Sequence, residues 1–299
     1  MSTLKVATTN FGLRAEPSLD DLLSHMDAFI GRAASAGAEL VVLPEFASTG
    51  LLAAITDHAV TGATVPVDYR DVLAPQFDAI ADGVKYLAAK HNLVVVGGSH
   101  NRIADDGSLR NTAIVAHPDG RVETQDKIHL TPPEHAMGAR GGDELLVTRI
   151  GPFTAGVLIC ADIQFPELSR YLVSRGVDLV ICPSLTWNRR GVHRVRIGCQ
   201  ARAIENQLYV VMSPLVGSSG LPEDAPLHAV GQALISTPVD KTIGINDGLL
   251  AISAAKGEDL VVAELDHDLL TASRAQPEAP GLALRRTDLF AKLRAEAEF

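Results

Sequence analysis

Cysteine and aromatic residues are scarce in this chain. Its 299 residues include three cysteines and one tryptophan, and aromatic residues make up 4% of the sequence. The cysteines, Cys160, Cys182 and Cys199, are odd in number and lack the paired spacing of a zinc site. A disulfide framework is therefore not indicated, and we expect a reducing, cytoplasmic setting.

Long apolar runs, basic character and cofactor motifs are also missing. No stretch approaches the roughly 18 apolar residues of a membrane helix, and the N-terminus lacks the apolar core of a signal peptide. The formal charge of −10 argues against a nucleic-acid surface. No Walker loop, dinucleotide fingerprint or His-Glu-x-x-His motif is present. We therefore expect a small-molecule partner, with no membrane, nucleic acid, metal or other cofactor.

Apolar, strand-like runs alternate with helical periodicity. The chain is 46% hydrophobic, enough for a large core. Helices are expected over Pro17–Ala36, with Ser18 as N-cap, and over Val72–His91, Pro166–Ser174 and His193–Asn206. Strands are expected at Leu4–Thr9, Glu39–Leu43, Leu93–Val96, Leu179–Cys182 and Leu208–Met212, with hairpins at Pro118-Asp119-Gly120 and Gly151-Pro152. Near-continuous apolar strands indicate sheets covered on both faces, hence the α/β class.

The C-terminal part differs in composition. We expect one domain over residues 1–270 and a tail over 271–299 that contains Pro277, Pro280 and Gly281. The tail could be disordered, but Leu284, Phe290 and their apolar neighbours favour packing on the domain or on a neighbouring subunit.

Three reactive residues each stand at the end of a strand-like run. Glu45 follows Val41-Val42-Leu43-Pro44, Lys127 follows a predicted strand, and Cys160 follows Ala155–Ile159. Together they supply a proton shuttle, a cation for a developing oxyanion and a nucleophile. This set suits attack on a C–N bond through a covalent thioester.

The segment after Cys160 predicts a strand-to-helix turn, which would aim the Ala161 N–H at an oxyanion. A nearby helix N-terminus and cation should also lower the pKa of the thiol. The alternative is a buried structural cysteine. Cys182 is interpreted as core because Pro183, which follows it, has no N–H to donate. Cys199 lies in a predicted helix and is also interpreted as core.

Each remaining candidate has an ordinary structural alternative. Glu45 could be a general base with a raised pKa, or it could cap a helix. Lys127 could be a solvated strand-end lysine, and Glu134 could orient Lys127 or lie on the surface. Trp187 could be pocket wall or core. The cluster containing Arg190 (Arg189, Arg190, Arg194 and Arg196) could be a solvated helix face, or Arg189 or Arg190 could bind a substrate carboxylate.

The chain resembles the nitrilase superfamily of carbon–nitrogen hydrolases. The resemblance rests on Leu43-Pro44-Glu45, Lys127-Ile128-His129-Leu130, Ile159-Cys160-Ala161-Asp162, Phe165-Pro166-Glu167, Pro183 to Trp187 and Arg202–Asn206. It implies a single-domain, four-layer α-β-β-α sandwich that pairs through a helical face into homodimers or larger assemblies. It assigns catalysis to Glu45, Lys127 and Cys160, and the additional active-site glutamate to Glu134. Ala161, Thr186, Trp187 and Arg190 are the candidate oxyanion and substrate contacts.

Ala161-Asp162 stands where true nitrilases of this superfamily place Trp-Glu. This departure resembles the amidase and carbamoylase branches, so we predict hydrolysis of a small-molecule amide. The alternatives are nitrile hydrolysis, acyl transfer to an amine, and a catalytically silent binding protein of the same fold.

Overall fold

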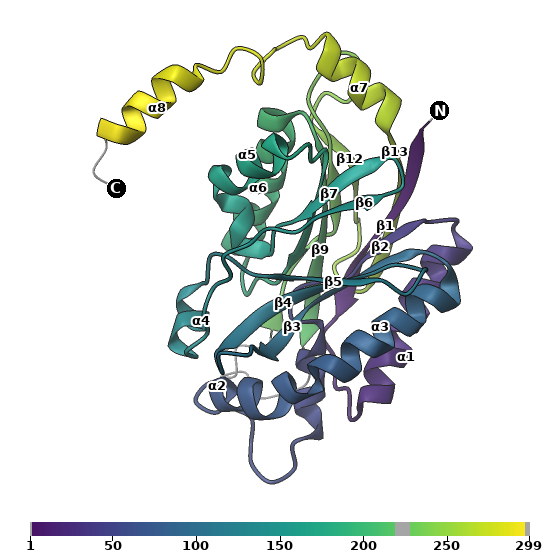
Figure 1. The fold of residues 1–299 in the computed structure, drawn as a ribbon. Coiled ribbons are helices and arrows are strands. Elements are labelled where there is room, and N and C mark those ends of the chain that lie inside the picture. The colour runs from purple at the N-terminus through teal and green to yellow at the C-terminus, as the bar shows by residue number, and fades with distance from the viewer. Residues whose placement is uncertain (1, 219–227, 297–299) are drawn as a thin grey trace.

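The computed structural model describes residues 2–218 and 228–296, and its strands join into one strongly curved sheet (Figure 1). The main strand order is β5-β4-β3-β2-β1-β9-β8-β7-β6. The strands are β1 (Thr3–Gly12), β2 (Leu40–Val42), β3 (Val94–Ile103), β4 (Leu109–Ala116), β5 (Val122–Asp126), β6 (Val147–Ile150), β7 (Phe153–Val157), β8 (Leu179–Ser184), β9 (Tyr209–Ser218), β10 (His228–Ala229), β11 (Leu234–Ser236), β12 (Leu249–Ile252) and β13 (Asp259–Asp266).

Helices cover both outer faces of this sheet. The α-helices are α1 (Leu19–Ser35), α2 (Val65–Asp68), α3 (Phe77–His91), α4 (Pro132–Ala136), α5 (Pro166–Ser174), α6 (Arg189–Asn206), α7 (His267–Ala275) and α8 (Thr287–Glu296), and short η turns include η1 (Ala47–Ala54) and η4 (Cys160–Gln164). Helices α1 and α3 pack against each other and on the half formed by β1 to β5 and β13. Helices α5 and α6 pack on the half formed by β6 to β9 and β11.

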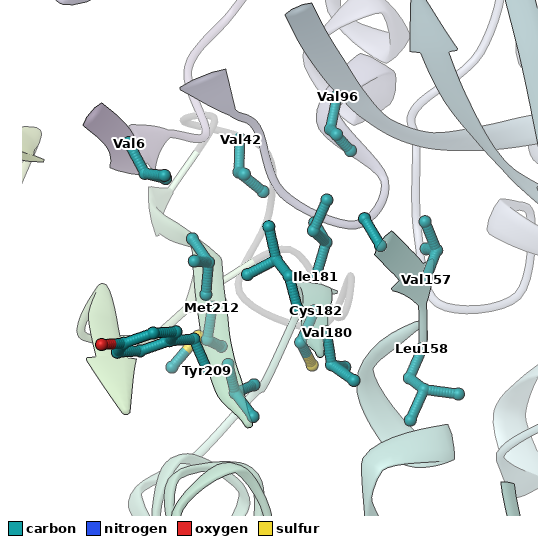
Figure 2. Close-up of a cluster of buried hydrophobic side chains, with 14 of the residues drawn as sticks. Val6, Val42, Val96, Val157, Leu158, Val180, Ile181, Cys182, Tyr209 and Met212 are labelled. Atoms are coloured by element: carbon teal, nitrogen blue, oxygen red, sulfur yellow. The ribbon is translucent and has the colours of Figure 1, made fainter. Parts of the chain in front are cut away.

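The two halves of the sheet face each other across a core. They join where β1 pairs with β9 over two residue pairs, Phe11 with Leu215 and Gly12 with Val216. Val6, Val42 and Val96 point toward the strands that carry Ile181 and Met212 (Figure 2). Their strand neighbours, including Ala7, Val41 and Val95, belong to the cluster that packs under α1 and α3. This period-2 alternation produces the four layers α-β-β-α.

Most local predictions agree with the structure. Ser18 caps α1 by accepting a hydrogen bond from the Asp21 N–H, and both predicted hairpins form, as β4–β5 and β6–β7. The predicted helix Val72–His91 is wrong at its start, because α3 begins at Phe77. A π turn (Tyr69–Leu73) and a 3₁₀ turn (Ala74–Gln76) precede it, and Pro75 cannot donate the hydrogen bond that a continuous α-helix needs. Helix α6 begins at Arg189 rather than His193, because the Asn188 side chain caps it.

The C-terminal segment leaves the body of the molecule after α7 (Figure 1). Helix α7 packs through buried Leu270 and Ser273. Helix α8 has no buried residue and exposes Leu289, Phe290 and Leu293. In the parts of the chain described, no helix is long and apolar enough to cross a membrane.

Candidate active site

Cys160 stands at a sharp turn between β7 and α5. Its backbone is left-handed, with φ of +47°, a conformation that non-glycine residues adopt rarely and often at functional turns. The first hydrogen bond of η4 runs from the Asp162 N–H to the Ile159 carbonyl at 3.0 Å, so the Ala161 N–H precedes the first bonded residue. The Cys160 thiol lies 3.3 Å from the Leu185 carbonyl and accepts from the Ser184 hydroxyl at 3.4 Å. The turn predicted from the sequence is therefore present.

Glu45 is held just beyond β2 by a tight backbone arrangement. The Ser99 N–H donates to the Pro44 carbonyl at 3.1 Å. Gly98, with φ of +82°, permits this approach, because a Cβ at position 98 would lie 2.1 Å from that carbonyl oxygen. The Leu185 N–H donates to Glu45 Oε2 at 2.9 Å, which fixes the carboxylate against the strand end of β8.

One buried ammonium joins two buried carboxylates. Lys127 Nζ donates to Glu45 Oε1 and to Glu134 Oε2, each at 2.7 Å. Asn111 Nδ2 donates to Oε1 of both glutamates, each at 2.9 Å. The Glu134 carboxylate also accepts hydrogen bonds from the N–H and the hydroxyl of Thr131, the N-cap residue of α4. Glu45, Asn111, Lys127 and Glu134 are each at most 3% exposed, so the charges interact in a poorly solvated site.

The surroundings separate the pKa values of the two glutamates. Burial raises the pKa of Glu45, and the attraction of Lys127 only partly offsets it. Burial also opposes ionisation of Glu134, but Lys127, Asn111 and the Thr131 N–H together lower the pKa of that carboxyl. Burial disfavours the Lys127 cation, yet the two carboxylates outweigh it and raise the pKa of Lys127. When the pKa values of two carboxyl groups are separated in this way, one group typically carries protons and the other stays a permanent anion.

The expected lowering of the thiol pKa is wrong. Burial raises the pKa of Cys160, the Glu45 carboxylate raises it further, and Lys127 opposes both effects without overcoming them. The helix terminus and the cation can be predicted from the sequence, but the extent to which the thiol is buried cannot. Cys160 therefore rests as a thiol beside Glu45, whose raised pKa agrees with the general-base interpretation of that residue.

Asp162 ties the loop of Lys127 to the loop of Cys160. Its buried carboxylate accepts from the backbone N–H groups of His129 at 2.7 Å, Ile128 at 3.2 Å and Ile159 at 3.3 Å. Two of these donors follow Lys127 and the third precedes Cys160. One side chain therefore sets the spacing between the ammonium and the thiol.

Glu45, Lys127, Glu134 and Cys160 line one cavity of about 280 Å³. Trp187, at its edge, is 36% exposed, so the structure places it in the pocket wall. The lining does not include the other predicted contacts, Ala161, Thr186 and Arg190. The Thr186 hydroxyl donates to the Val230 carbonyl, and Arg190 lines a separate surface hollow formed by α6 and Gln164 of η4.

Asn111 and Asp162 were not singled out by the sequence analysis as functional. Asn111 lies in β4 between Arg110 and Thr112, next to the apolar run Ala113–Ala116, and a buried amide in such a strand needs polar partners, which is a usable signal. Over residues 2–218 and 228–296, no group of three or more His, Cys, Asp or Glu side chains is arranged to hold a metal ion.

Residues 6–275 match the family model for carbon-nitrogen hydrolases. The chain belongs to this family. Its sequence is 28% identical to the probable hydrolase YhcX of Bacillus subtilis over 96% of this chain and 54% of that protein, so it spans about half of that relative. It is 29% identical to the deaminated glutathione amidase of Synechocystis over 88% of this chain and 93% of that protein.

The fold of this carbon–nitrogen hydrolase is also found in solved structures. A double mutant of the amidase from Nesterenkonia sp. AN1, in complex with acrylamide, superposes with a TM-score of 0.75 at 22% identity, over 98% of both chains. At this identity the likeness concerns the fold. The family match and the shared fold confirm the predicted carbon–nitrogen hydrolase and its α/β sandwich.

Proposed function

We propose that this protein hydrolyses the C–N bond of a small-molecule amide through a thioester on Cys160, without a cofactor. The observation that carries the proposal is the Lys127 ammonium held between two glutamates of opposite pKa shift, in the cavity that the thiol also lines. This arrangement combines a nucleophile, a proton carrier and a fixed positive charge.

In the first half of the reaction, Glu45 accepts the Cys160 proton while sulfur attacks the amide carbonyl carbon. Because the thiol pKa is raised, proton transfer accompanies C–S bond formation instead of preceding it. The carbonyl electrons move onto oxygen, and the third N–H of Lys127 and the Ala161 N–H stabilise that charge. Collapse breaks the C–N bond, and Glu45 delivers its proton to the departing nitrogen.

In the second half, Glu45 removes a proton from water as the water oxygen attacks the thioester carbon. The C–S bond then breaks, the carboxylic acid leaves, and the sulfur regains its proton from Glu45. Glu134 keeps its charge throughout and is a positioning residue for Lys127, because its lowered pKa makes it a poor proton carrier.

One relative supports an amide substrate. The Synechocystis relative is named for amidase activity, which agrees with Ala161-Asp162 after Cys160.

The test measures ammonia or amine release by wild type, Cys160→Ala and Cys199→Ala. The substrate panel contains aliphatic amides, ω-amides of dicarboxylic acids, N-carbamoyl amino acids and matched nitriles. Cys199→Ala is the matched control, since Cys199 is a fully buried thiol that does not line the cavity. We expect release by wild type and the control only. Equal release by folded Cys160→Ala, or acid formed from nitriles but not amides, would contradict the proposal.

We also propose a homo-oligomer that functions in the cytoplasm. Ile197 and Ile204 are seven residues apart on α6, hence on one helix face, and both are exposed, as is Tyr171 on α5. The exposed apolar side chains of α8 suit packing on a neighbouring subunit. The three cysteines are free and buried, which suits a reducing compartment. The molar mass of wild type and Ile197→Glu, measured by light scattering, tests the assembly. A monomer mass for both proteins would refute the proposed homo-oligomer.

A further inference from the structure

The wall of the cavity beside Cys160 is apolar. Its side chains include Phe46, Val65, Tyr69, Met137, Leu185 and Trp187. The cavity, at about 280 Å³, is near the lower limit of ligand pockets, which span roughly 300–1,000 Å³. The Tyr69 hydroxyl lies 3.4 Å from the Thr49 hydroxyl, and burial raises the Tyr69 pKa to about 12, so this side chain stays an uncharged phenol.

The only cation in this lining is Lys127, and its charge is already matched. Glu45 and Glu134 both contact it, so the ionised site carries one net negative charge. Arg189 and Arg190 line other hollows. Residues 219–227, which the structure does not describe, contain no lysine or arginine. A carboxylate on the acyl chain of a substrate would therefore lose its water without gaining a cationic partner and would face a negative site.

From these observations we infer that the site takes small carboxamides with an uncharged, apolar acyl group and rejects amides whose acyl group carries a carboxylate. The inference rests on the proposed function, because it concerns the substrate of the same Cys160 site. It also removes the sequence hypothesis that Arg190 binds a substrate carboxylate, since Arg190 does not reach this cavity lining.

The test compares two substrates of equal length, 5-methylhexanamide and the monoamide of glutaric acid, in which a carboxylate replaces the isopropyl group. We expect kcat/KM to be at least about 100-fold higher for the uncharged amide, because a buried charge without a partner is strongly discriminated against. The Met137→Arg variant places a cation at the half-buried edge of the cavity and should narrow the ratio at least tenfold. Tyr86→Arg is the matched control, because Tyr86 is 65% exposed on α3 and should leave the ratio unchanged.

The outcomes separate this inference from the proposed function. Cys160-dependent turnover of both amides at similar kcat/KM would overturn the inference and leave the proposed function standing. If the enzyme hydrolysed other panel amides but neither amide of this pair, the inference would again be overturned and the proposed function would stand. Absence of Cys160-dependent release from the whole panel would overturn both. The inference would also be refuted if Tyr86→Arg narrowed the ratio of the two kcat/KM values as much as Met137→Arg does. The effect would then not arise in the cavity.

Discussion

Replacing the two buried glutamates by glutamine, one at a time, should have different effects. Glu45→Gln should mainly lower activity, whereas Glu134→Gln should lower stability. In Glu45→Gln the proposed proton carrier is lost, and we expect kcat/KM to fall by about 10²–10⁴-fold, the usual effect of general acid–base catalysis. A glutamine at position 45 could still accept the Leu185 N–H that now binds Oε2. The shape of the site should therefore be kept while its proton chemistry is lost.

The effect on stability follows from the sign of each pKa shift. Because the folded-state pKa of Glu45 is raised, its ionised form destabilises the fold above that pKa, and glutamine removes this penalty. We expect an unchanged or higher Tm for Glu45→Gln at pH 8. The lowered pKa of Glu134 means that its charge stabilises the fold above its unfolded-state pKa. Loss of its charge-assisted bonds should cost about 2 kcal/mol, or a Tm lower by about 4–8 °C.

The assay combines kcat/KM for the best panel amide with thermal unfolding of wild type, Glu45→Gln and Glu134→Gln at one scan rate. A loss below tenfold in Glu45→Gln would remove Glu45 from the role of proton carrier. Equal Tm changes in the two variants would refute the separation of their pKa values, because both replacements would then remove equivalent charges.

Three other predictions concern pH and positioning. The acid limb of the kcat/KM profile should lie above 4.5, the ordinary glutamate pKa, since Glu45 must be ionised to accept a proton and its pKa is raised; a limb at or below 4.5 would argue against this. Asp162→Asn should lower kcat at least about tenfold, because small displacements of catalytic groups are costly, while nearly unchanged kcat with a lowered Tm would show a purely structural role. Burial lowers the pKa of His100 from 6.5 to about 4, so stability should decline by up to about 3 kcal/mol as pH falls from 6.5 to 4. Urea unfolding at pH 7 and 4.5 should show this loss in wild type but not in His100→Gln, and parallel losses would contradict it.

Local sequence patterns predicted the parts of the site that lie at strand ends. Apolar runs before Glu45 and Cys160 mark buried strands, and the chain direction places a polar residue where each run stops. Lys127 instead follows the polar strand β5. The strand-to-helix turn at Cys160 was predictable in the same way, because Pro166 opens a helix shortly afterward. Pro75 in the predicted helix Val72–His91 was a local warning that α3 begins later.

Contacts between distant segments were decided only in the tertiary structure. Asn111 contacts Glu45 across 66 positions, and Asp162 contacts His129 across 33, and no local periodicity encodes such pairs. The direction of the Cys160 pKa shift also depended on burial, which outweighs the nearby cation. The sequence alone therefore determined which chemical groups stand at the strand ends, because side-chain alternation is a local property of the backbone. Only the packed structure determined their charges, their spacing and the apolar cavity around them, because solvation and electrostatic interaction depend on everything nearby in space.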